Sequence, residues 1–265
     1  MDSIINYILR AELHNRVGAG KLQSCLFERK YQLKYIKKDG RNSVVFDPEL
    51  NMYFENEKGF AFVYEIEIEN TSFILSNKLE KATDFIRRIN YMYDWAQLQT
   101  NKQGKLLFIK NEEELKQKWG KIKKTLLADY KGKEVEVYLK EIDSKFADST
   151  ILYSSIHQYF NFGLLFPSIP CEHRKQWQTE REIEFSEYEK EKFQEQIIFQ
   201  QEENNQRIYS VIIKPLEDSN FELEQYEGSI IVPSNDIFPV SALIEVVFRK
   251  DNIANQWYFK LERTN

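Results

Sequence analysis

The segment from Phe60 to Asn70 constrains the fold more than any other part of the chain, because apolar residues alternate with other types along it. Successive side chains of a strand point to opposite faces of the sheet, so this alternation places one row toward a core and, from Glu65 onward, carboxylates toward water. The apolar row consists of Phe60, Phe62, Tyr64, Ile66 and Ile68. The pattern predicts a half-buried strand of the antiparallel type.

Comparable strand patterns occur at both ends of the chain and are separated by a helical middle. Strands are predicted at 25–37, 44–46, 52–54, 60–68, 89–97, 106–109, 193–200, 207–214, 229–232, 240–248 and 257–261. Strands followed by helices and then by strands favour an α+β fold over repeated βαβ units. We expect an antiparallel, strongly curved sheet or partly open barrel, built from N- and C-terminal strands, with two to three amphipathic helices inserted in the middle. We expect a single domain, 1–265, with sub-regions 1–110, 111–170 and 171–265.

The helical middle carries the clearest local signals. Asn111 can cap a helix, and Glu114 can reach back to the cap amide. Trp119 lies on the apolar stripe that follows, so its ring is expected in the core. A second helix is predicted through 135–146, and a third after a cap at Asp148 or Ser149. A short helix is also predicted over 79–88.

Two other segments are open to more than one interpretation. Near the N-terminus, apolar residues at helical spacing predict a short helix, and interspersed charges make a signal peptide the wrong interpretation. The apolar residues are Ile4, Ile5, Ile8, Leu9 and Leu13. Residues 187–197 suit a strand and a helix equally.

Composition excludes several classes of protein. A net charge of -5 and a pI of about 5.5 argue against a nucleic-acid partner, and no apolar run is long enough for a membrane span. Two cysteines are too few for a secreted disulfide scaffold, and neither a signal peptide nor a membrane span is predicted, so we expect a cytoplasmic protein, with export by a signal-independent route as the alternative. Abundant Lys, Asn, Ile and Glu with scarce Gly and Pro are compatible with an AT-rich bacterial genome.

The candidate catalytic residues are sparse. Cys171 and His173 have a spacing that two zinc ligands could use, but structural zinc needs four ligands. Cys171 could also be a nucleophile with His157 or His173 as its base. Gly18-Ala19-Gly20-Lys21 lacks the other residues of a phosphate loop. We expect no metal, no cofactor and no enzymatic activity.

The aromatic segment from Tyr159 to Pro170 is the best candidate for contact with another molecule. Gly163, Pro167 and Pro170 prevent regular structure, and loops normally lie at the surface. This predicts an exposed apolar contact surface formed by Tyr159, Phe162, Phe166 and Trp177. The alternative is a connector buried between helix and sheet.

These observations leave three hypotheses for function. The first is a non-enzymatic interaction protein, of immunity, chaperone or secretion-accessory type, that binds a protein partner through the aromatic loop or a sheet edge. The second is a small-molecule or lipid carrier with an aromatic cavity. The third is an enzyme whose site, including Cys171 and His173, is assembled only in the fold. The layout is similar to the curved sheet with capping helices of some lipid carriers and secretion chaperones, and fold alone does not fix function.

Overall fold

The computed structural model describes residues 4–17, 21–39, 43–47, 52–56, 61–75, 80–101, 104–169, 178–184, 192–216, 221–251 and 253–264. The strands are β1 (Ile4–Val17), β2 (Lys21–Asp39), β3 (Ser43–Asp47), β4 (Met52–Asn56), β5 (Ala61–Leu75), β6 (Trp95–Thr100), β7 (Leu106–Ile109), β8 (Gln178–Glu184), β9 (Lys192–Glu203), β10 (Gln206–Pro215), β11 (Phe221–Pro233), β12 (Ser241–Lys250) and β13 (Ile253–Thr264). The helices are α1 (Glu80–Ile89), the 3-10 helix η1 (Asn90–Tyr93), α2 (Glu112–Asp129), α3 (Lys133–Ala147) and α4 (Ser149–Ile156).

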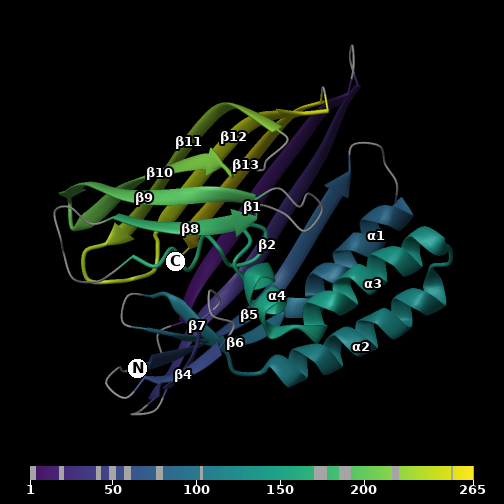
Figure 1. Ribbon diagram of the computed structural model, residues 1–265, viewed down its shortest axis with the longest axis horizontal. Coiled ribbons are helices and arrows are strands. Elements are labelled where there is room, and N and C mark those ends of the chain that lie inside the picture. The colour runs from purple at the N-terminus through teal and green to yellow at the C-terminus, as the bar shows by residue number, and fades with distance from the viewer. Residues whose placement is uncertain are drawn as a thin grey trace.

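One curved antiparallel sheet organises the molecule (Figure 1). Its eleven strands run in the order β7-β6-β5-β2-β1-β13-β12-β11-β10-β9-β8, and β3 and β4 form a separate hairpin. The first and last strands pair at the centre, with Leu9 opposite Leu261. Strands from both ends of the chain therefore form one sheet with helices from its middle, which confirms the predicted α+β fold.

The sheet is open, and α4 lies between its two end strands. The Tyr153 hydroxyl donates to the Leu106 carbonyl in β7 at 2.7 Å, while α4 also packs against β8. The helices gather on one side of the sheet (Figure 1). The gap between the end strands is thus bridged by side chains of a helix rather than by backbone pairing.

The period of two predicted for β5 is present. Ile66 and Ile68 are buried, whereas Glu67 and Glu69 are exposed. The strand shifts register opposite Lys30 and Tyr31 of β2, after which Thr71 and Phe73 continue the inward row. The same alternation in the neighbouring strands gives the sheet an apolar concave face.

The predicted N-terminal helix is wrong, because residues 4–17 form β1. Tyr7, Leu9 and Ala11 point inward with a period of two, and Ile4 lies exposed on the other face. Pairing with β2 on one side and with β13 on the other provides hydrogen-bond partners for the backbone of this strand. Long-range pairing therefore overrides the local helical spacing.

The helical middle agrees with prediction except at one cap. Trp119 is buried, as predicted. Asp148 caps α4, because its side chain accepts a hydrogen bond from the Thr150 amide at 2.7 Å. Asn111 precedes α2 as predicted, but its side chain makes no cap hydrogen bond. The Asn111 side chain instead accepts a hydrogen bond from the Gln97 amide and donates one to the Trp95 carbonyl. These two bonds join the start of α2 to β6.

One strand boundary differs from expectation, and one ambiguous segment is assigned in part. The strand predicted to begin at residue 89 begins at Trp95, because α1 continues into η1. Of the ambiguous segment 187–197, the part from Lys192 onward belongs to β9, and 185–191 lie outside the described residues.

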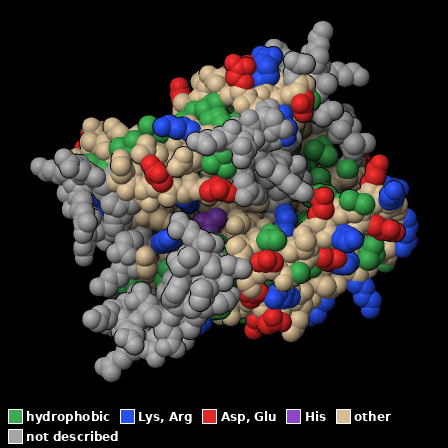
Figure 2. Space-filling view, viewed as in Figure 1, with side chains coloured by type: hydrophobic (Ala, Val, Ile, Leu, Met, Phe, Trp, Pro, Cys, Tyr) green, Lys and Arg blue, Asp and Glu red, His purple; other side chains and the backbone are tan. Residues whose placement is uncertain are grey.

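The lysines of α2 lie on a face of mixed charge. Lys116 pairs with Glu112 at 2.8 Å, and Lys123 pairs with Asp143 of α3 at 2.5 Å. Acidic and basic side chains are interspersed over the helices in the space-filling view (Figure 2). This arrangement is typical of a solvated helical surface.

Candidate functional site

Residues 157–169, here called the connector, lead out of α4 and lie within the hydrophobic core. Tyr159, Phe162 and Phe166 are at most 1% exposed. The prediction that these three side chains form an exposed surface is therefore wrong, and the alternative of a buried connector holds. Trp177 lies outside the described residues.

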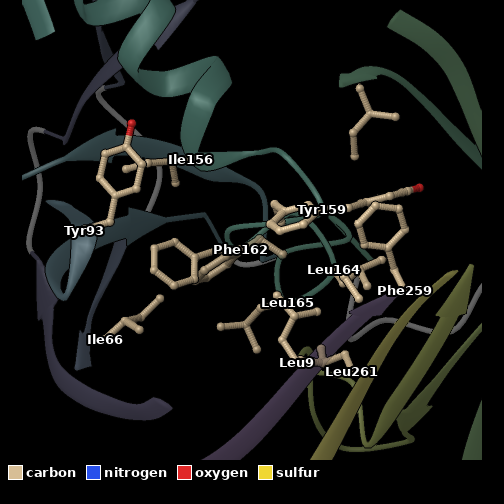
Figure 3. Close-up of a cluster of buried hydrophobic side chains, with 14 of the residues drawn as sticks. Leu9, Ile66, Tyr93, Ile156, Tyr159, Phe162, Leu164, Leu165, Phe259 and Leu261 are labelled. Carbon is tan, nitrogen blue, oxygen red and sulfur yellow. The ribbon is translucent and has the colours of Figure 1, made fainter. Parts of the chain in front are cut away.

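The connector packs against strands from both ends of the chain. Its side chains lie between those of β5, such as Ile66, and those of β1 and β13 (Figure 3). The Phe160 ring lies 4.7 Å from that of Phe27 on β2, and the Tyr159 ring lies 5.5 Å from that of Phe259 on β13. The connector thus occupies the concave face of the sheet.

Irregular backbone lets this short segment bury so many side chains. The Gly163 amide donates to the Gln158 carbonyl at 3.0 Å. A Cβ at Gly163 would lie 2.0 Å from the His157 carbonyl oxygen, so the turn requires glycine. Ser168 has a φ of 62°, in the left-handed region that non-glycine residues rarely adopt.

Arg29 holds the first half of the connector. This side chain is fully buried on β2, and its Nη1 donates to the Phe160 carbonyl and to Asn161 Oδ1, each at 3.1 Å. Asn161 Nδ2 in turn donates to the Ser155 carbonyl at 2.7 Å. A guanidinium inside the sheet is therefore linked to the end of α4.

Arg181 holds the second half from β8, the end strand on the other side of the sheet. Its Nη1 donates to the Phe166 carbonyl at 3.0 Å and its Nη2 to the Gly163 carbonyl at 2.9 Å. Its Nε donates to Glu195 Oε1 on β9 at 2.7 Å. Arginines from two distant strands thus bind the backbone of one irregular segment.

The buried charges at the Arg181 end have shifted pKa values. Burial raises the pKa of Glu195 well above its ordinary value, and it lowers the pKa of Arg181 to about 10. Glu195 Oε2 has no hydrogen-bond partner in the described part of the chain. Arg181 keeps its charge at neutral pH and donates to a desolvated carboxyl group, so this end of the connector is held by a charge-assisted hydrogen bond.

His157, the first connector residue, is held neutral. Burial lowers its pKa to about 3, with smaller contributions from Arg181 and Lys105. Its ring lies 4.6 Å from that of Tyr153. An imidazole with so low a pKa is suited to packing rather than to proton transfer near neutral pH.

The described part of the structure does not assemble the residues considered for catalysis or metal binding into a site. Cys171 and His173 lie outside the described residues. Cys25 is partly buried, and burial raises the pKa of its thiol to about 12, so it is a poor nucleophile. Within the described ranges, no group of three or more His, Cys, Asp or Glu side chains could hold a metal ion.

The sequence contained a signal for the residues that hold the connector. Arg29 falls in the apolar row of β2 between Phe27 and Tyr31, and Glu195 falls between Phe193 and Ile197 on β9. A charged residue at an inward position of an alternating strand is costly unless it is partnered. Such positions point to buried polar contacts, although they do not identify the partner.

Comparisons with known proteins leave the family open. No protein-family model matches the chain, and no curated protein matches it. A solved structure described as "lipid-protein interactions in lipovitellin" is 8% identical with a TM-score of 0.47, and the match covers 99% of this chain. It spans a quarter (25%) of the length of that chain. At this identity and TM-score, the likeness says nothing about what the present chain binds.

No helix in the described part of the chain combines the length and the apolar character that crossing a membrane requires.

Proposed function

We propose that this protein is a carrier of small apolar molecules or lipids, which bind at the concave face of the sheet in place of the connector. The observation that carries the proposal is the connector itself, an irregular aromatic segment buried inside an open curved sheet. Binding sites of this kind are concave and mostly apolar, with few polar groups.

The bonding pattern supports displacement of the connector. The end strands β7 and β8 are not paired with each other, so α4 and the connector can move without breaking the ladders of the large sheet. Movement would break the contacts to Arg29 and Arg181 and expose apolar side chains. An apolar ligand would cover the exposed apolar side chains again. Their exposure is the larger part of the free energy lost when the connector moves.

The proposal predicts that loosening the connector improves binding. We call the form in which the connector fills the concave face the closed form. In Asn161→Ala the contacts of residue 161 with Arg29 and Ser155 are lost, which destabilises the closed form by about 1–2 kcal/mol. Apparent affinity rises as the binding-competent fraction increases, so we expect about five- to thirtyfold tighter binding. The measurement is saturation of Nile red fluorescence, followed by displacement with dodecanol.

A matched control is Asn255→Ala. Asn255 is also buried, and its side chain donates to the Ile253 carbonyl within β13. This variant should lose stability without a gain in affinity. Absence of saturable binding by the wild-type protein, or weaker binding by Asn161→Ala, would contradict the proposal.

Binding of a protein partner at a sheet edge stays a prediction. The end strands β7 and β8 are the places where an added strand could pair. A stable protein partner recovered with the native protein, and lost when β8 pairing positions are changed to proline, is the result expected of that alternative.

A further inference from the structure

Two buried polar atoms of the sheet make no hydrogen bond within the described part of the chain. They are Oε2 of Glu195 on β9 and the hydroxyl of Tyr226 on β11. A buried polar atom without a partner is unfavourable, so native proteins usually satisfy it with the chain, with water or with a ligand. These two atoms are therefore candidates for binding a polar group of a ligand.

The Tyr226 hydroxyl lies on the concave face, in space that the next inward residue of β11 leaves open. A Cβ at Gly228 would lie 2.3 Å from this hydroxyl, so the hydroxyl occupies the place of a side chain there. The other atoms nearest to that place belong to Val211 of β10 and Ile244 of β12, which are both buried. The hydroxyl thus lies against apolar side chains instead of water.

Glu195 reaches the same part of the concave face. It is opposite Ile213 of β10, which shares its face with Val211. Burial raises the pKa of Tyr226, and the nearby Glu195 carboxyl raises it further, while Arg181 lowers it. The register and this electrostatic influence together place the carboxyl and the phenol in one polar site.

Arg181 links this site to the connector. Its Nε donates to the other carboxyl oxygen of Glu195, and its two Nη atoms donate to the carbonyls of Phe166 and Gly163. The site is therefore next to the second half of the connector. A ligand that replaces the connector would meet Glu195 and Tyr226 while the pairing of their strands stays intact.

The chemistry of the site favours an uncharged head group. An ionised carboxyl accepts hydrogen bonds, a protonated one also donates, and a phenol hydroxyl does both. An alcohol hydroxyl, which donates and accepts, can pair with all of these. An anionic ligand would bring a second acid beside Glu195, and a cationic ligand would bring a second positive charge beside Arg181, where like charges repel strongly.

We infer that the ligand is an uncharged amphiphile with a hydroxyl head group, such as a long-chain alcohol, and that Glu195 and Tyr226 hydrogen bond to this hydroxyl while the alkyl chain replaces aromatic side chains of the connector. The inference rests on the proposed carrier function and adds to it the class of ligand.

The test compares three ligands with the same alkyl chain. Dodecanol donates and accepts hydrogen bonds, dodecyl methyl ether only accepts, and dodecanoate is an anion. Each is titrated against the Nile red complex near neutral pH. We expect dodecanol to bind about tenfold more tightly than the ether, and also more tightly than dodecanoate.

Two results would overturn this inference and leave the carrier function standing. One is equal binding of dodecanol and the ether, which is expected if the two polar groups bind only water. The other is tighter binding of dodecanoate than of dodecanol. No displacement of Nile red by any of the three ligands would overturn the carrier function.

Tyr226→Phe assigns the preference to the site, because it removes the hydroxyl and keeps the ring. The ratio of alcohol to ether affinity should fall about threefold or more. The melting temperature should not fall, since the lost hydroxyl has no partner in the described part of the chain. Tyr7→Phe is the matched control, because the Tyr7 hydroxyl is also buried but donates to the Pro239 carbonyl at 3.0 Å. It should lower the melting temperature and keep the ratio.

Glu195→Gln is the second variant. Its amide oxygen can still accept from Arg181, and its amide nitrogen only donates, so an ether oxygen can pair with it as well as an alcohol can. The ratio of alcohol to ether affinity should again fall. Tyr226→Phe and Glu195→Gln proteins that both unfold cooperatively and both keep the wild-type ratio would overturn the assignment of the hydroxyl to this site.

Discussion

At the scale of single residues, the side chains that matter most are polar groups inside the apolar face of the sheet. Arg29 and Glu195 are buried and Arg181 is half-buried, and each contacts the connector or one of the others. Strand alternation in the sequence places the positions of Arg29 and Glu195 inward. Alternation cannot identify the partners, because Arg29 donates to Phe160 and Asn161, which lie more than a hundred residues away in the sequence.

His157 makes the stability of the fold depend on pH. Its pKa is about 3 in the folded protein and about 6.5 in the unfolded chain, so the unfolded chain binds more protons between these values. This contribution to stability is complete above about pH 6.5 and is lost as the pH falls toward about 3, by at most about 1.4 kcal/mol per pH unit. Denaturant unfolding of wild type and His157→Gln between these pH values measures it.

The expected difference is a weaker fall in stability with acid for His157→Gln. The raised pKa of Glu195 acts in the opposite direction in both proteins, so the comparison isolates the histidine. Parallel pH profiles for the two proteins would show that His157 is not held neutral by the fold.

At the scale of elements, Trp119 joins two helices. Its ring stacks on Phe146 of α3 with centres 5.9 Å apart, and its Nε1 donates to Asp143 at 2.8 Å. Trp119→Ala should destabilise the protein by about 3–5 kcal/mol, the usual cost of removing a large buried aromatic ring. The denaturant midpoint measures this change.

Trp95 provides the control for that prediction. Its side chain is 36% exposed at the start of β6, so Trp95→Ala should cost only about 1 kcal/mol. A midpoint for Trp119→Ala as high as that of Trp95→Ala would be incompatible with the helix packing described here.

The elements that could be predicted from sequence are those with local causes. The apolar stripe through Trp119 predicts α2, and the cap at Asp148 predicts α4. The alternation of apolar residues predicts β5. The helical spacing near the N-terminus misleads, because the strand conformation of residues 4–17 depends on pairing with β2 and β13, which both follow later in the chain. The irregular backbone of the connector predicts a surface position, because such backbone usually lies at the surface. In the structure, the side chains of Arg29 and Arg181 instead satisfy part of that backbone.

At the scale of the whole molecule, one open sheet surrounds a segment of its own chain. The N- and C-terminal strands meet at β1 and β13, as strand patterns at both ends of the sequence suggested. The path of residues 157–169 through the concave face could not be predicted, since it depends on the curvature of eleven strands together. This arrangement is the basis of the proposed exchange between the connector and an apolar ligand.

Hydrogen exchange of the connector amides, with and without bound dodecanol, measures whether the ligand displaces the connector. The Gly163 and Phe166 amides donate to carbonyls of Gln158 and Phe162 in the closed protein. We predict that the ligand accelerates exchange at these amides and leaves the β10–β11 pairing around Ile208 and Ile231 unchanged. A ligand that binds to saturation while the connector amides keep their full protection would contradict displacement of the connector.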